Sequence, residues 1–272
     1  MDACIWLLDN GTPPDHIRWI VPRDSWLLDR RNYQPGEEYF AKVCKGLADQ
    51  VEAVAVADTI DDTFLELEER EFLARIDPSV VPEAYHCAVI SPGELDQLRS
   101  ITDVVRLGRV THLTPVEIVL ERGTVAATTN PLYIDCSAQG IPRRPAKPIF
   151  DGDRITPQWV RTCQPTFSAA FVGHVEAAYD DDDIKNELCQ PIEPPEVPLD
   201  YLRMFQRELA TRTCWDRYPE VRTWLENCRL DPFSSVAKTR VGADAEATEH
   251  LGRYLKNYGT AVEKLDALLG PV

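Results

Sequence analysis

The residue whose type and position most directly suggest chemistry is Arg23, which follows an apolar run at residues 17–21. Such a run is typical of a parallel strand buried on both faces. In a dinucleotide-binding βαβ unit, the residue ending the second strand lies roughly 20 residues past the glycine-rich loop, where an Arg accommodates a 2′-phosphate. Arg23 therefore predicts recognition of an adenosine 2′-phosphate, with Arg30 or Arg31 assisting. The alternative is a surface Arg23 paired with Asp24.

A helix and a turn in front of the strand would position Arg23. Residues 1–11 predict a short amphipathic helix with Cys4 on its apolar side and Gly11 just past its end. Residues 12–15 then form a turn. The first strand and the G-x-G-x-x-G loop of the unit would precede Met1, and without them the backbone N–H groups that hold a pyrophosphate are missing. We therefore expect a truncated or mis-started reading frame.

The pattern changes from helical to extended in the middle of the chain. Residues 34–100 predict a helical insertion, with its clearest helix start at the Ser91 and Glu94 capping box. From residue 104, three short strands around a hairpin at residues 121–124 predict a β-meander. A further strand is expected at residues 132–136.

The second half of the sequence is predominantly helical. Residues 141–147 form a Pro- and Arg-rich connector, which is the candidate domain boundary. A mainly apolar helix is predicted from about Pro165, and residues 191–198 read as a stiff extended linker. Beyond that linker, apolar residues recur at three- and four-residue steps, which predicts helices.

Composition limits the partners and the location. The 272 residues carry a net charge of −16, from 45 acidic and 29 basic residues, which disfavours nucleic acid and anionic membranes as partners. No apolar run approaches the roughly 20 residues of a membrane helix, and Asp2 and Asp9 argue against a secretory signal. We expect a cytoplasmic protein. The eight cysteines are scattered without a C-x-x-C pair, so we expect them to be reduced.

Several catalytic motifs are absent from the sequence. There is no G-x-S-x-G elbow, no H-E-x-x-H and no glycine-rich phosphate loop ending in Lys-Ser/Thr. The histidines show no ligand spacing, and the four aspartates at residues 180–183 lack the spacing of a calcium loop. We predict no metal site and assign no catalytic residue.

Three runs together resemble a known family. They are IRWIVPRDSWLLDR at residues 17–30, IDCSAQG at residues 134–140 and DGDRITPQWVR at residues 151–161. They are similar to bacterial FAD/NAD(P)-binding oxidoreductases of the flavin monooxygenase and pyridine-nucleotide oxidoreductase type. The resemblance extends to about Tyr179 and aligns the chain with the middle and end of a family member, without the N-terminal FAD fingerprint.

This resemblance implies cofactor contacts at two turns. In the resembling enzymes a small-residue turn returns the chain to the flavin domain, and Ser137 and Gly140 match it, although an ordinary strand exit fits them equally. A Gly-Asp pair in those enzymes binds the flavin ribityl chain, which implies this role for Gly152 and Asp153. Such pairs are also common in plain turns. The helix from Pro165 would point its positive end at the flavin.

The implied fold is α/β and has three parts. Residues 1–140 would form a partial NAD(P)-binding Rossmann-like domain with the helical insertion and the β-meander, and residues 141–190 the C-terminal segment of an FAD-binding domain. Residues 191–272 would form a helical region that packs on the flavin side or serves as a dimerisation arm.

Two functions remain open. The first is that of the C-terminal portion of a flavin-dependent oxidoreductase that uses FAD and NADP on a small-molecule substrate, inactive alone because the dinucleotide loops are missing. The second is that of a non-catalytic remnant or interaction module, which could form a homodimer through its orphaned sheet edge.

Overall fold

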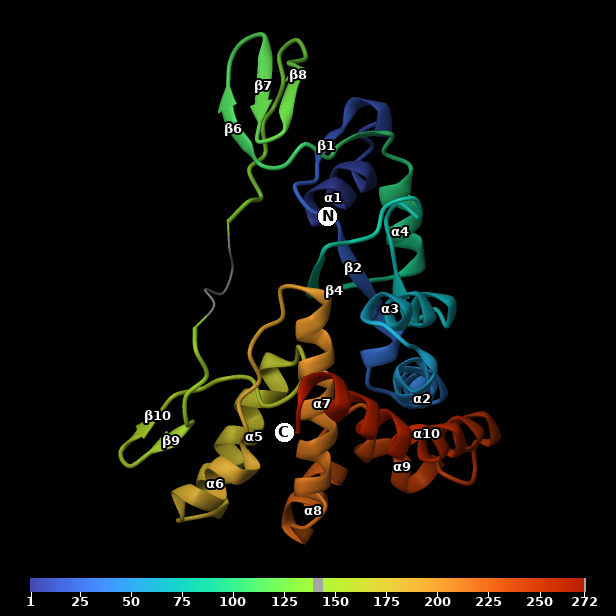
Figure 1. Ribbon diagram of the computed structural model, residues 1–272, viewed down its shortest axis with the longest axis vertical. Helices are drawn as coiled ribbons and strands as arrows, with labels where there is room; N and C mark the ends of the chain where they lie inside the picture. The colour runs from blue at the N-terminus through green and yellow to red at the C-terminus, as the bar shows by residue number, and fades with distance from the viewer. Residues whose placement is uncertain (139–143, 272) are drawn as a thin grey trace.

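The computed structural model describes residues 1–138 and 144–271. It is a mixed α/β protein in which about half of the residues are helical and the strands form small separate sheets. The molecule is elongated, with the meander and the N-terminal elements at one end and most helices at the other (Figure 1). Within the described ranges, no helix has the length and apolar character needed to cross a membrane.

The first helix forms as the sequence predicts. Helix α1 (Asp2–Asp9) buries Cys4 against α4 (Pro92–Arg99), which is capped at its start by the expected Ser91 and Glu94 box. Gly11 has φ +84° and donates its backbone N–H to Leu8 O at 3.0 Å. A residue with a side chain is rarely found at that φ, which explains the glycine at the helix end.

The strand after α1 is parallel, as expected, but not fully buried. Strand β1 (Arg18–Ile20) pairs with β5 (Asp103–Val105), and these two strands form a sheet of their own. All three residues of β1 are half-buried. The expectation of burial on both faces is therefore wrong for β1 itself, although Ile17 and Val21, which flank it, are buried.

Two of the three strands of a second sheet lie inside the region predicted to be a helical insertion. Strand β2 (Ser25–Asp29) lies between β3 (Leu73–Ala74), which is antiparallel to it, and β4 (Ala84–Ile90), which is parallel. The prediction of helices alone is wrong here, although α2 (Phe40–Val56) and α3 (Ile60–Glu69) occupy most of the region.

The predicted meander is present. Strands β6 (Val110–Leu113), β7 (Glu117–Leu120) and β8 (Gly123–Ala126) pair in that order and are antiparallel. The strand expected at residues 132–136 does not form, because no other strand lies beside it in the described part of the chain.

The helical end of the molecule has two cores. One joins β2, α2 and α3 to α7 (Pro198–Trp215) and α10 (Ala245–Leu269) around Phe64, Tyr85 and Tyr201. The other joins the β9–β10 hairpin to α5, α6 and α8 around Phe167, Phe171 and Trp215. The bounds of the remaining elements are β9 (Phe150–Asp151), β10 (Arg154–Ile155), α5 (Pro165–Ala178), α6 (Asp182–Leu188), α8 (Pro219–Asn227), α9 (Ser234–Arg240), and the 3-10 turns η1 (Pro14–His16), η2 (Arg30–Tyr33) and η3 (Glu37–Tyr39).

The final helix and one pair of cysteines depart from expectation. Helix α10 packs mainly on α2 rather than on the 141–190 segment, while α8 does contact that segment. Cys87 and Cys163 form a disulfide across 76 positions of sequence, so the expectation that all cysteines are reduced is wrong. The bond ties β4 to the loop that precedes α5.

Candidate functional site

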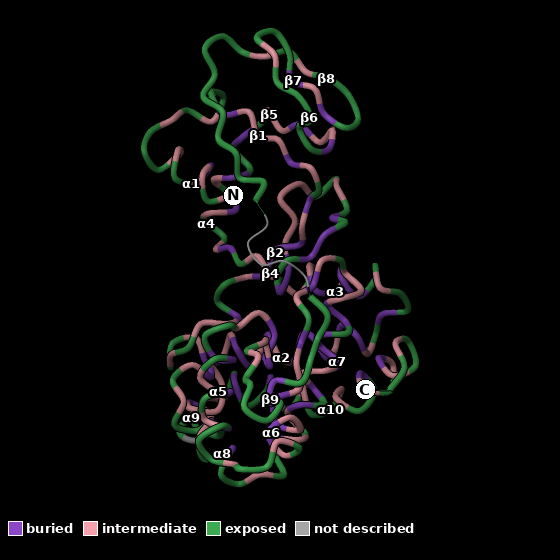
Figure 2. The backbone as a smooth tube through the Cα atoms, turned by 90° about the vertical axis from the view of Figure 1, so that its left-hand side faces the viewer, coloured by how far each residue is buried: buried purple, intermediate pink, exposed green. Residues whose placement is uncertain are grey.

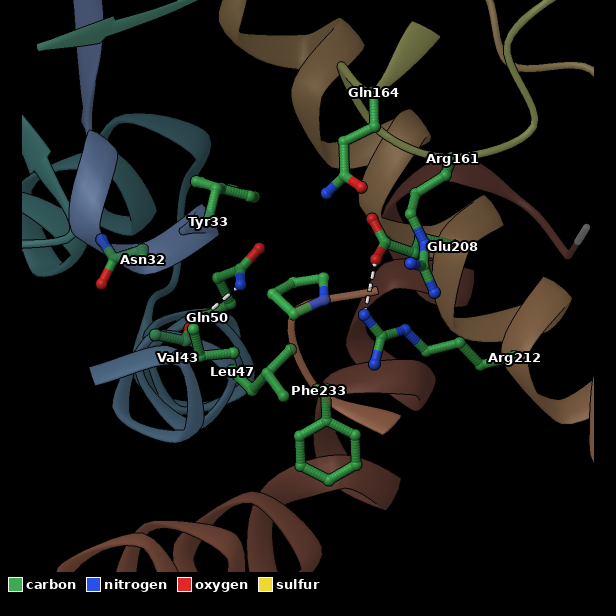
Figure 3. Close-up of a pocket in the computed structure, with 12 residues that line it drawn as sticks. Asn32, Tyr33, Val43, Leu47, Gln50, Arg161, Gln164, Glu208, Arg212 and Phe233 are labelled. Carbon is green, nitrogen blue, oxygen red and sulfur yellow. Dashed lines mark hydrogen bonds and ion pairs between the residues drawn. The ribbon is translucent and has the colours of Figure 1, made fainter. Parts of the chain in front are cut away.

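A polar pocket lies between η2 and α2 on one side and α7 on the other (Figure 3). Helix α2 and η2 form one side, and the loop before α5, helix α7 and residues 232–233 form the other. Its cavity is about 30 Å³, within a hollow of about 430 Å³ that includes space open to solvent. The inner part therefore admits only one or two waters or a single small polar group.

The pocket lining combines apolar and polar side chains. Tyr33, Val43, Leu47 and Phe233 supply apolar surface. Arg161, Gln164, Glu208 and Arg212 supply polar groups on the side of α7 and the loop before α5, and Asn32 and Gln50 supply them on the side of η2 and α2 (Figure 3). Apolar surface with a few polar groups is the usual lining of a small-molecule site.

Two ion pairs balance the charge of the polar side. The Arg161 guanidinium contacts the Asp231 carboxylate at 3.2 Å, and these residues are only 4% and 2% exposed. One turn of α7 places Arg212 beside Glu208, with Nη2 donating to Oε1 at 2.8 Å. Burial acts to raise the pKa of Glu208, but Arg212 and Arg161 outweigh it and hold that pKa below its ordinary value. Both carboxyl groups are therefore charged at neutral pH.

The pocket also holds buried hydrogen-bond donors without an acceptor. Neither Asn32 Nδ2 nor Arg161 Nε has a hydrogen-bond partner among the described residues, and both residues line the pocket. Gln50 is already engaged, since it donates to Gly46 O at 2.9 Å and accepts from the Tyr201 hydroxyl at 3.1 Å. Unmatched buried donors favour a guest that brings an acceptor oxygen. Because the two ion pairs cancel, an uncharged carbonyl suits the pocket better than an additional anion.

Arg23 lies where the sequence predicts, after the carboxyl end of β1, and is exposed. The alternative pairing with Asp24 is wrong, because Asp24 is held by Arg106 through Nε at 2.9 Å and Nη2 at 3.2 Å. No ion pair joins Arg23 to another residue of the described ranges. Burial, together with the nearby charge of Arg23, lowers the pKa of His86.

The neighbouring arginines are both engaged in ion pairs. Arg30 Nη2 contacts Glu94 Oε2 at 2.9 Å, and Arg31 Nη2 contacts Asp29 Oδ2 at 2.6 Å. Both side chains are about half exposed. An incoming phosphate would therefore compete with a carboxylate for either of them, but not for Arg23.

The residues implied by the family resemblance lie apart from Arg23 and Arg30. Gly152, with φ +62°, and Asp153 form the exposed turn of the β9–β10 hairpin, at the other end of the molecule from β1 (Figure 1). The backbone N–H of Gly152 donates to Asp182 Oδ2 at 2.8 Å. Ser137 is exposed and its N–H is bound by Asp135, while Gly140 lies outside the described residues. The structure therefore does not bring Gly152 and Asp153 into one site with Arg23.

The sequence did not predict the pocket residues, because they are far apart in the chain. Residues 32, 161, 208 and 231 meet only in the fold. One available signal was the Glu208 and Arg212 pair, spaced by four on a helix whose other residues include the buried Phe205 and Leu209. No group of three or more potential metal ligands occurs in the described ranges.

Comparison with known proteins yields relatives without an assigned role. No protein-family model matches the chain, and no solved structure matches it. It is 45% identical over 269 residues to the uncharacterized protein Rv2000 of Mycobacterium tuberculosis and to the uncharacterized protein Mb2023 of Mycobacterium bovis. The match covers 99% of this chain but 50% of each relative. The chain thus spans about half the length of the curated relatives it matches.

Proposed function

We propose that this chain is part of an NADPH-dependent flavoprotein oxidoreductase with FAD as the second cofactor. The observation that carries the proposal is Arg23, an exposed arginine at the carboxyl end of a parallel strand, with no ion pair to the described residues. Ligands of open parallel sheets bind beyond the carboxyl ends of the strands, and an Arg at this point fits a 2′-phosphate.

The surrounding elements support the same assignment. Helix α1 leads through a turn into β1, β1 pairs in parallel with β5, and the meander follows directly. This order supports the proposal of an incomplete Rossmann-like NAD(P)-binding domain. The relatives are twice as long as the chain, which leaves room elsewhere in a longer protein for the glycine-rich loops that these residues lack.

The remaining roles follow from the resemblance. Arg30 would assist Arg23, and Gly152 and Asp153 would contact the flavin ribityl chain, with Ser137 and Gly140 at the return to the flavin domain. The polar pocket would receive the small-molecule substrate. The flavin supplies the redox chemistry when bound, and the residues of this chain position it. We place the protein in the cytoplasm, where the Cys87–Cys163 disulfide would be an exception to the reduced state that is usual for thiols.

The experiment that tests this proposal compares adenosine 2′-phosphate with adenosine 5′-phosphate as probes. We expect the first to bind the chain more tightly, and Arg23→Ala to weaken that binding at least about tenfold, or roughly 1.4 kcal/mol, by removing a charge-assisted contact. Arg109→Ala removes another exposed arginine and serves as the matched control, with no change expected. Equal affinity for both probes, or equal losses in both variants, would exclude the assignment of Arg23.

A second candidate function is that of a non-catalytic interaction module. The observation in its favour is the exposed apolar stretch after β8, which offers a surface for another polypeptide. The two functions differ in a simple readout: full-length relatives purified with bound flavin favour the oxidoreductase, and colourless ones the interaction module.

A further inference from the structure

Strand β1 has one edge occupied and one edge open. The backbone N–H of Val21 donates to Val105 O at 2.9 Å, so residues 19 and 21 direct their backbone groups toward β5. Alternate residues of a strand bond to opposite sides. Arg18 and Ile20 therefore direct their N–H and C=O groups to the other edge, where no strand lies among the described residues.

An exposed apolar segment begins close to the β1–β5 pair. The Arg18 guanidinium donates to Ala126 O at 2.5 Å and to Asp103 Oδ2 of β5 at 2.8 Å, which fixes the last residue of β8 beside the β1–β5 pair. Beyond it the chain is exposed as far as residue 138, apart from a half-buried Ala127 (Figure 2). Leu132, Tyr133 and Ile134 are 83%, 45% and 51% exposed, respectively. Consecutive large apolar residues in water are unfavourable and mark a surface that is covered by something else.

The chain is long enough for residues 132–136 to lie one strand away from the open edge of β1. Adjacent strands lie about 4.8 Å apart, so a segment one place removed from β1 would lie about 10 Å from it. The six residues from Ala126 to Leu132 span up to about 20 Å when extended. Residues 132–136 can therefore reach the far side of a strand added to β1.

We infer that the open edge of β1 and residues 132–136 together bind an extended polypeptide segment, which adds a strand between them. The occupant is an apolar strand from the half of the longer protein that this chain does not cover. The length of the relatives is the reason for choosing this source: the match covers 50% of them, so a second half of equal size exists there to supply the strand. The inference needs no flavin chemistry and is independent of the proposed function.

The net charge of the chain disfavours a second copy of the chain as the occupant. A chain with net charge −16 repels its own copy at an edge that is not otherwise shielded. The added strand would complete backbone hydrogen bonds on both of its sides and bury the side chains of Leu132 and Ile134.

The experiment is co-expression of this chain with the tagged, unmatched half of Rv2000 from M. tuberculosis, followed by hydrogen exchange. We expect the two polypeptides to co-purify, and the amides of residues 18, 20 and 132–136 to exchange at least about tenfold more slowly than in the chain alone. Failure to co-purify, or protection of the chain alone through a dimer of itself, overturns the inference. Protection of residues 132–136 in the monomer also overturns it, since the segment would then fill the edge of β1 by itself.

Two pairs of variants separate docking from misfolding. Ile20→Pro removes the N–H that faces the open edge and leaves the ladder to β5 intact, whereas Ile20→Ala keeps that N–H. Ile134→Lys places a charge in the covered surface, and Thr128→Lys places one on the exposed approach to it. We expect Ile20→Pro and Ile134→Lys to abolish co-purification, and Ile20→Ala and Thr128→Lys to retain it. Ile20→Pro could also unfold the strand, which a lower melting temperature of that variant would reveal. In that case the Ile134→Lys result alone decides whether the segment docks.

Discussion

The helical end and the meander end of this molecule use apolar residues in opposite ways. At the helical end, Phe171 is fully buried, with its ring centroid 4.5 Å from that of Trp215 and 5.5 Å from that of Trp224. At the other end, Leu132 and its neighbours are exposed in a segment beside which no described residue forms a strand. Residues of similar character thus stabilise the fold in one region and contribute nothing to it in the other.

This difference shows which part of the chain is self-sufficient. A helix satisfies its own backbone hydrogen bonds, so α5, α7 and α10 need only bury one face. A strand takes its backbone hydrogen bonds from neighbouring strands, and β1 has such a neighbour on one edge within the described ranges. We therefore expect substitutions at the helical end to change the stability of the chain alone, and those near β1 to change association instead.

The largest expected effect is the loss of an aromatic side chain from the helical core. Phe171→Ala removes a fully buried ring and leaves a cavity, which costs about 3–5 kcal/mol of unfolding free energy. Urea denaturation measures the loss, and Phe171→Leu, which fills more of the space, is expected to lose clearly less. A loss below about 1 kcal/mol would mean that this core is not closed as described.

The next effect comes from the buried ion pair beside the pocket. Asp231→Asn leaves the Arg161 charge uncompensated and is expected to cost about 3–5 kcal/mol. The double variant with Arg161→Met should recover part of this loss, because it removes the second charge as well. No recovery would show that Asp231 acts through the backbone N–H groups of Phe233 and Ser234 instead.

The same pair gives the chain a pH dependence with a defined sign. Burial acts to raise the pKa of Asp231, but Arg161 and the two backbone N–H groups outweigh it and keep it below the ordinary value. Stability from this carboxylate is therefore present above the unfolded pKa of about 3.9 and lost as pH falls through the lower folded pKa. Chemical denaturation between pH 7 and pH 2 should show this acid-side loss in the wild type and a smaller one in Asp231→Asn.

These elements also show how far the sequence could predict the fold. The first helix, its glycine, the capping box of α4 and the meander depend on residues a few positions apart, and all were predicted. The pairing of β2 with β4 joins residues about sixty positions apart, and the Cys87–Cys163 bond crosses 76. No local pattern encodes such contacts. The pocket was missed for the same reason, since Asn32, Arg161, Glu208 and Asp231 come from four separate segments.

The disulfide tests whether β4 and the helical end depend on each other. Cys87→Ser opens the bond and is expected to lower the unfolding free energy by about 2–4 kcal/mol, the usual range for a disulfide. Reductant should lower the wild type to the same value, and Cys136→Ser, at an exposed free cysteine, should change nothing. Thiol titration of the denatured wild type should find six free thiols. Eight free thiols, or no change with reductant, would rule out the bond.

The smallest expected change in unfolding free energy comes from the exposed segment at residues 132–136. It gives the most direct comparison between the two ends of the molecule. Ile134→Lys in the isolated chain should change the unfolding free energy by no more than about 0.5 kcal/mol, because the side chain has few neighbours to lose. A lysine at the fully buried Val175 of α5 places an unpaired charge in the helical core. Val175→Lys should cost several kcal/mol of unfolding free energy, because the buried charge loses its hydration. Thermal melts of both variants measure the contrast. If Ile134→Lys destabilises the chain as Val175→Lys does, residues 132–136 are already packed in the monomer, and the two ends of the molecule do not differ in the way their surfaces indicate.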